Sequence, residues 1–220
     1  MSFSAKGLAM ELVFVILKTR GAHMVEKMVA NIIGQMTEAK IINKMQEEYY
    51  TYSLLAIIER TITIGTILAI SLLIRNLFPT LFFLAFFLSL RQRTGGFHFN
   101  TFWQCYLGTV GSYMLIVLGS RFGIRYSHLL LCLLLLAIVL IAVLGTVNHP
   151  NMHMDKVELA GSKKAARLLV FLQGSATYFF AFLKMNMMYI YYMSIAIILC
   201  ATLLCLAKII KQEVREDEEN

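Results

Sequence analysis

The sequence predicts an all-α protein: a polytopic membrane bundle of about six transmembrane segments with an amphipathic helical region at its N-terminus. Of its 220 residues, 59% are hydrophobic and only 15% are charged. A soluble domain carries about 25% charged residues. The hydrophobic residues also fall in runs that are longer than the core helices of soluble domains need. A chain of this length has room for one bundle, and we expect no separate soluble domain.

Residues 1–50 are amphipathic rather than membrane-spanning, and Gly21 divides them into two predicted helices. Helical spacing places five apolar side chains on one face: Val25, Val29, Ile32, Ile33 and Met36. Such helices lie in the membrane interface or form a cytoplasmic cap on the bundle, and both interpretations stay open.

Residues 51–210 are expected to form the transmembrane bundle. Its six apolar segments are residues 54–74, 77–90, 102–120, 129–147 and two within 168–207, separated at Lys184, Met185 and Asn186. A straight span needs about 20 residues. The second and fifth segments are shorter, so we expect them to be tilted, extended by flanking residues or set in thinned bilayer.

The distribution of basic residues predicts that both termini lie in the cytoplasm. With the N-terminus inside, the outer connections hold only Arg75, Arg121, Arg125 and Lys184, and most other Lys and Arg residues lie inside. The expected location is therefore the cell membrane, with several passes. Tyr189, Tyr191 and Tyr192 are expected to form an aromatic belt near the outer interface.

Residues 211–220 are predicted to be an acidic, disordered tail, and the rest of the chain is basic. Removing the five acids and one arginine of residues 213–219 from totals of 13 and 20 leaves 8 acidic and 19 basic residues, a net charge of +11. Such a charge suits anionic membrane lipids and also an acidic peptide partner. We expect no nucleic-acid partner.

The four cysteines are Cys105, Cys132, Cys200 and Cys205. Their spacing fits no zinc pattern, so we expect no metal and no cofactor. The last three lie deep in apolar runs and are interpreted as small packing residues. Cys105 differs from them because polar and flexible residues precede it.

The densest polar cluster near a nucleophile lies in residues 91–105. It contains two arginines, two adjacent glycines, a histidine and a cysteine: Arg91, Arg93, Gly95, Gly96, His98 and Cys105. An imidazole can take the proton of a thiol and later return it to a leaving amine. His98 and Cys105 could fill these two roles. From spacing alone, an interfacial histidine and a packed cysteine remain the alternative.

Helix geometry limits how His98 and Cys105 can meet. In one continuous helix, seven residues correspond to about 10.5 Å of rise, whereas a general base must approach within about 3 Å of the thiol. The chain must therefore break between them, with Asn100 or Thr101 as the N-cap of the next helix. Cys105 would then lie near a helix N-terminus, where the dipole favours the thiolate.

Three further residues could approach this cluster. Glu59 lies near the start of the first span, where it either reaches the interface or orients His98 or pairs with Arg91. Asn148 and His149 lie on the next inner connection. A surface connection needs no function to contain such residues.

The pattern Arg-x6-His, Gly-Gly-Phe-His and His-x6-Cys, followed by an apolar span, resembles the accessory gene regulator B (AgrB-type) family. The Asn148-His149-Pro150 stretch and the order of segments are also similar. Phe99 departs from the small residue expected at its position, and residues 1–50 give no clear match.

The resemblance implies a cysteine endopeptidase that processes a small amphipathic propeptide in quorum sensing. Cys105 would cleave at the C-terminal side of the future signal, His98 would protonate the leaving acidic peptide, and the thioester would close to a thiolactone or lactone ring. It also implies that Arg91 and Gly96 belong to the site. Arg93 fits recognition of an acidic peptide or stands as a membrane-flanking cation. The resemblance favours a homodimer, although the oligomeric state stays open.

Two other classes of function remain alternatives. A small peptide transporter or exporter should carry polar residues along several spans, and the spans here are almost entirely apolar. A non-catalytic membrane scaffold would leave the His98 and Cys105 pair without a role.

Overall fold

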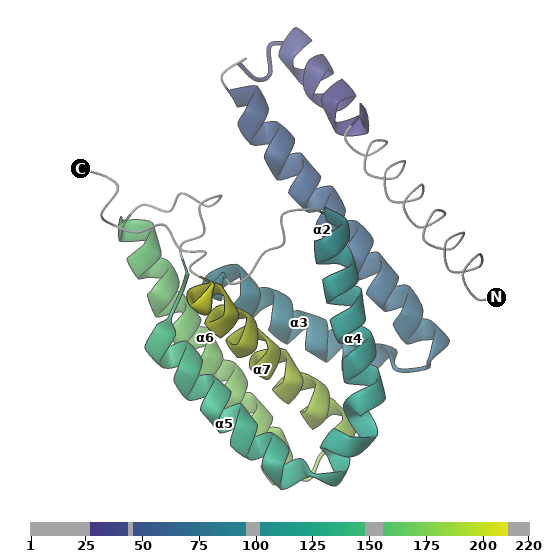
Figure 1. Ribbon diagram of the computed structural model, residues 1–220, viewed down its shortest axis with the longest axis vertical. Coiled ribbons are helices and arrows are strands. Elements are labelled where there is room, and N and C mark those ends of the chain that lie inside the picture. The colour runs from purple at the N-terminus through teal and green to yellow at the C-terminus, as the bar shows by residue number, and fades with distance from the viewer. Residues whose placement is uncertain (1–26, 44–45, 96–101, 148–155, 211–220) are drawn as a thin grey trace, which may run out of the picture. The chain divides into compact units, whose positions relative to one another are not determined.

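A computed structural model describes residues 27–43, 46–95, 102–147 and 156–210 of the chain. Almost all of these residues are helical, and the described part contains no strand (Figure 1). The helices are residues 27–38, α2 (Glu47–Leu73), α3 (Leu77–Thr94), α4 (Phe102–Arg125), α5 (Ser127–Leu144), α6 (Lys156–Phe182) and α7 (Met187–Ile209). The predicted all-α fold is confirmed.

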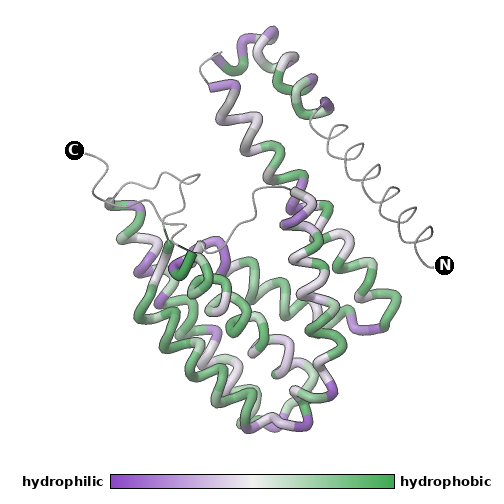
Figure 2. The backbone as a smooth tube through the Cα atoms, viewed as in Figure 1, coloured by the Kyte–Doolittle hydropathy of each residue, from purple (hydrophilic) through white to green (hydrophobic). Residues whose placement is uncertain are grey.

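Five of the described helices are long and apolar enough to cross a membrane: α2, α4, α5, α6 and α7. Figure 2 shows hydrophobic residues along nearly the whole length of α5. The sixth apolar segment is α3, whose last turn holds Arg91 and Arg93. Its 18 residues rise about 27 Å, close to the thickness of a bilayer core. The other segment that is short in the sequence is α6, which has 27 residues. Both α3 and α6 are therefore helices extended by flanking residues.

The chain divides into two compact units. The first, called the N-terminal unit, comprises Met1–Ile67 and Phe99–Val110, and the second, called the C-terminal unit, comprises Leu68–His98 and Gly111–Asn220.

In the C-terminal unit, α7 is the central helix, and it packs against α3, α5 and α6 (Figure 1). It begins at Met187 because Asn186 accepts a hydrogen bond from the backbone N–H of Met188 at 2.9 Å. Lys184 has a left-handed φ of 53°, which confirms the predicted break between the last two spans. Cys200 is fully buried in this core, as predicted for a packing residue. Cys132 on α5 is exposed, so the predicted packing role of Cys132 is wrong.

Hydrogen bonds between polar side chains join the helices of the C-terminal unit. The amide of Asn76 donates to the hydroxyl of Tyr192 at 2.8 Å. The Thr80 and Tyr113 hydroxyl oxygens lie 2.7 Å apart. Thr80, Tyr113 and Tyr192 are buried, so their hydroxyls need partners inside the bundle.

The predicted aromatic belt is wrong for two of its three tyrosines. Tyr191 is only 4% exposed and Tyr192 is fully buried. The Tyr191 hydroxyl donates to the carbonyl oxygen of Ile116 at 2.9 Å. These tyrosines point into the bundle because their hydroxyls find partners on neighbouring helices there.

Replacing Gly123 by alanine is expected to destabilise the protein. A Cβ at Gly123 would lie 2.2 Å from Cε2 of the buried Tyr191 ring, whose hydroxyl is already hydrogen-bonded. Overpacking of this kind costs about 1–3 kcal/mol. The midpoint of thermal unfolding in detergent measures it. Gly111→Ala on the same helix meets nothing within 4 Å and serves as the control. Equal midpoints for the two variants would contradict the described contact.

The N-terminal unit has a small apolar core of its own. Val29, Ile33 and Ile42 are buried, and Met36, Leu54, Leu55 and Ile58 pack against them. The predicted apolar face of the N-terminal helix therefore holds for Val29, Ile33 and Met36. It fails for Ile32, which is 38% exposed, and Val25 lies outside the described residues.

Candidate active site

Cys105 lies in the first turn of α4, which begins at Phe102, and its side chain is partly exposed. It is not disulfide-bonded. The carbonyl oxygen of Cys105 accepts a hydrogen bond from the Thr109 hydroxyl at 2.8 Å. The first turn of a helix stabilises a nearby negative charge, so this position favours the thiolate form of the cysteine.

Aromatic side chains hold this first turn within the N-terminal unit. The rings of Trp103 and Tyr106 pack edge-on with their centroids 5.7 Å apart. The Tyr106 hydroxyl donates to Thr66 Oγ1 on α2 at 3.2 Å. The turn that carries Cys105 is therefore attached to α2 by a side-chain hydrogen bond.

In the C-terminal unit, α3 ends at Gly95. This glycine has φ 63° and ψ −138°, a conformation that is strongly disfavoured for residues with a Cβ. Its N–H donates to the carbonyl oxygen of Arg91 at 3.1 Å, and Nη1 of Arg91 donates to the carbonyl oxygen of Gly95. Arg91 therefore contacts the backbone at the point where α3 ends, a contact that the sequence pattern did not indicate.

A segment 53 residues further along the chain also contacts the end of α3. The Thr146 hydroxyl donates to the carbonyl oxygen of Arg93 at 2.8 Å, and the Val147 N–H donates to the carbonyl oxygen of Thr94 at 3.0 Å. Thr94, Thr146 and Val147 are almost completely buried. We call this set of contacts, including Gly95, the α3 clamp.

Replacing Gly95 by alanine is expected to lower stability by about 1–3 kcal/mol, the usual cost of a non-glycine residue in a disfavoured backbone region. In addition, its Cβ would lie 2.8 Å from the carbonyl oxygen of Val147. Thermal unfolding in detergent measures the loss. Gly161→Ala on α6, which meets nothing within 4 Å, is the matched control. If the Gly95→Ala protein is as stable as the control, α3 does not end in the backbone conformation given for Gly95.

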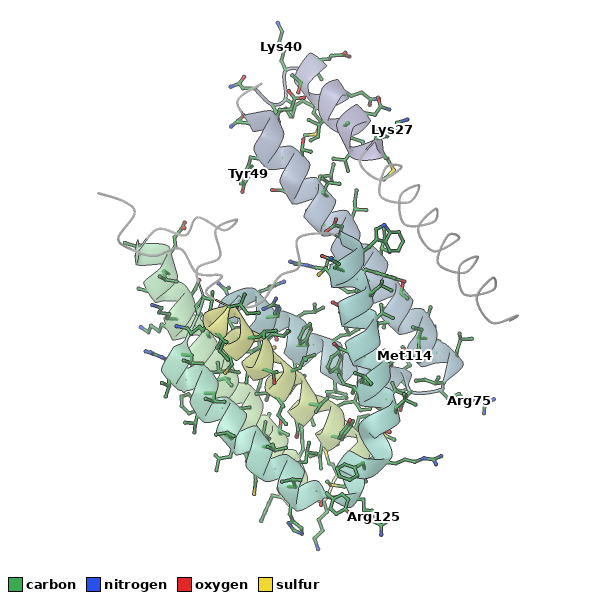
Figure 3. All side chains as sticks on the ribbon, viewed as in Figure 1. Lys27, Lys40, Tyr49, Arg75, Met114 and Arg125 are labelled. Carbon is green, nitrogen blue, oxygen red and sulfur yellow. The ribbon has the colours of Figure 1, made fainter. Side chains whose placement is uncertain are left out.

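Basic side chains surround the clamp. Arg93 is exposed beside it, and the Lys163 side chain packs beside Gly145 at the end of α5. Nε of Arg167 donates to the carbonyl oxygen of Ala142 at 2.9 Å. At the other ends of these helices, Arg75 and Arg125 are exposed and point away from the bundle (Figure 3). The clamp thus lies at a basic end of the C-terminal unit.

Several predicted site residues lie outside the described residues: Gly96, His98, Asn100, Asn148 and His149. Glu59 is partly exposed on α2, in the same unit as Cys105. Arg91, Arg93 and Gly95 belong to the C-terminal unit. The structure brings Arg91, Arg93 and Gly95 together at one helix end. The pairing of His98 with Cys105, and of Glu59 with His98 or Arg91, stays a prediction.

No group of three or more His, Cys, Asp or Glu side chains that could hold a metal occurs among the described residues.

The family model described as accessory gene regulator B (AgrB) matches residues 25–207, which is most of the chain and covers the larger part of each unit. No curated protein and no solved structure matches the chain.

Proposed function

Because the chain belongs to the accessory gene regulator B family, we propose that it is a cysteine endopeptidase that converts a small propeptide into a cyclic signal. The family match and the apolar helices support a helical membrane protein of the accessory gene regulator system with a part in peptide processing. The proposal that it is a cysteine endopeptidase rests on the position of Cys105, which is partly exposed in the first turn of α4.

The first half of the reaction cleaves the propeptide. The Cys105 thiolate attacks the carbonyl carbon of the scissile peptide bond, and backbone N–H groups at the start of α4 are suited to stabilise the oxyanion. The carbon–nitrogen bond then breaks. His98, which took the thiol proton, returns it to the leaving amine. The products are the acidic C-terminal fragment and a thioester between Cys105 and the N-terminal fragment.

The second half of the reaction closes the ring. A cysteine thiol or serine hydroxyl within the bound fragment attacks the thioester carbonyl and gives its proton to the neutral imidazole of His98. The Cys105 sulfur leaves as the thiolate, and the product is a thiolactone or a lactone. Exchange between two thioesters is nearly isoenergetic, so a site that excludes water favours cyclisation over hydrolysis.

Substrate recognition is assigned to the basic end of the C-terminal unit. The exposed Arg93 is suited to bind carboxylates of the acidic fragment through its guanidinium. Arg91 and Gly95 shape the end of α3 from which the His98 segment begins. Gly96 and Asn100 are assigned to the turn and to the helix cap, and Glu59 is assigned to orienting His98.

We further propose that the protein crosses the cell membrane several times, with its termini and active site in the cytoplasm. Exposed apolar side chains on α2, α4, α5 and α6 suit contact with lipid. Anionic lipids would neutralise the basic cytoplasmic end. A homodimer is part of the same proposal.

The described polar contacts give no support to the transporter alternative. The Asn76 amide and the buried Thr80 and Tyr192 hydroxyls form hydrogen bonds between helices, and the amide of Gln173 donates to Ser89 Oγ at 2.8 Å. Polar groups that pair in this way join helices. These contacts therefore support packing between helices rather than a polar transport path.

Reconstitution tests the proposed function. The full chain in vesicles is mixed with a synthetic propeptide that has an amphipathic start, an internal cysteine and an acidic end, such as one encoded beside the gene. We expect a free acidic fragment and a ring-closed product, detected by mass spectrometry. Pretreatment with iodoacetamide should stop both. Processing that continues after complete alkylation of Cys105 would refute the proposal.

A further inference from the structure

We propose that Thr146 is a positioning residue for the reaction: its hydroxyl holds the end of α3 from which the chain leads to His98. This inference rests on the proposed function. The evidence is the α3 clamp, in which Thr146 donates to the carbonyl oxygen of Arg93 at 2.8 Å.

The last four carbonyl groups of an α-helix have no partner within the helix. In α3, the Arg91 carbonyl accepts from Gly95, the Arg93 carbonyl from Thr146 and the Thr94 carbonyl from Val147. Two of these partners come from the segment after α5. The end of α3 is therefore fixed by a distant part of the chain.

Threonines on the described helices typically donate to the carbonyl four residues earlier, as Thr109 does to Cys105 and Thr177 to Gln173. The carbonyl four residues before Thr146 is that of Ala142, which accepts from Arg167. Thr146 donates across to Arg93 instead. Its hydroxyl thus joins two segments that are 53 residues apart.

Thr146 is 1% exposed, and Thr94 and Val147 are fully buried, so water does not readily replace a lost donor here. A buried carbonyl left without a donor is costly, and the chain moves to avoid it. Loss of the Thr146 hydroxyl is therefore expected to shift the end of α3.

Gly95 lies against the Val147 carbonyl, and α3 ends at this residue with a positive φ. His98 is three residues further on. A general base must lie within about 3 Å of the thiol, and a displacement of about 1 Å can cost up to a hundredfold in rate.

The test compares Thr146→Val with Thr146→Ser in the full chain in vesicles. Valine keeps the shape and loses the donor, whereas serine keeps the donor. We expect Thr146→Val to lower kcat for propeptide cleavage roughly tenfold to hundredfold with little change in KM. Below neutral pH, alkylation of Cys105 should be slower in Thr146→Val than in the unaltered protein. The same change is expected when His98 is replaced by alanine. In Thr146→Ser, both kcat and the alkylation rate of Cys105 should be close to those of the unaltered protein.

Thr177→Val is the matched control, because Thr177 is also fully buried but its hydroxyl donates within its own helix. Its kcat per folded protein should stay unchanged. If Thr146→Val fails to fold, Thr146→Ala is measured by the same criteria. Unchanged kcat in the donor-less variant, or a loss that serine does not restore, overturns the proposal. Absence of cleavage by the unaltered protein would instead refute the proposed function.

Discussion

Replacing Cys105 by alanine is expected to abolish propeptide cleavage while the protein still inserts into the membrane. Alanine has no nucleophile, so the peptide bond is not attacked and no thioester forms. Cys105 is partly exposed in the first turn of α4, and alanine is a good helix former. We therefore expect little effect on folding. The measurement is release of the acidic fragment in reconstituted vesicles.

The control for Cys105→Ala is Cys132→Ala. Cys132 is exposed on α5 and forms no disulfide, and the proposed reaction gives it no role. Cleavage should continue at an unchanged rate in this variant. Full processing by Cys105→Ala would remove the basis of the enzymatic assignment and leave the scaffold alternative.

Replacing His98 by alanine is expected to lower cleavage by about 10²–10⁴-fold, the usual contribution of a general acid–base. It should also change how alkylation of Cys105 depends on pH. A cationic imidazole beside a thiol stabilises the thiolate, so the thiolate reacts at lower pH than a thiol without such a partner. Without His98, the alkylation rate should fall more steeply as the pH is lowered. The alkylation rate at a series of pH values measures this.

His128→Ala provides the control for His98→Ala, because His128 is exposed on α5. It should change neither cleavage nor alkylation. If His98→Ala leaves the pH dependence of alkylation unchanged, the two residues do not form the pair required by the mechanism. The acid–base role would then belong to another residue.

Much of the fold follows from hydropathy, because long apolar segments in a chain with so little charge have few other solutions. The break at Lys184–Asn186 is an example, since a cation and an amide interrupt an apolar run. The orientation of Tyr191 and Tyr192 could not be predicted. Because α7 is apolar on all sides, periodicity does not indicate which face packs on other helices.

The candidate site was predictable only where its residues are close in the sequence. Cys105 stood out because polar and flexible residues precede it. The contact of Thr146 with Arg93 joins residues 53 positions apart and depends on helix packing. A local signal did exist, since glycine after a helix commonly marks its end. Both Gly95 and Gly145 have positive φ at such ends.

The central claim is that Cys105 carries the peptide as a thioester. Intact mass spectrometry of the full-length protein, quenched in acid during turnover with propeptide, tests it most directly. We expect an added mass equal to the N-terminal fragment, located on the peptide that contains Cys105 and removed by neutral hydroxylamine. Continued processing with no adduct on Cys105, or with an adduct on another residue, would contradict the claim.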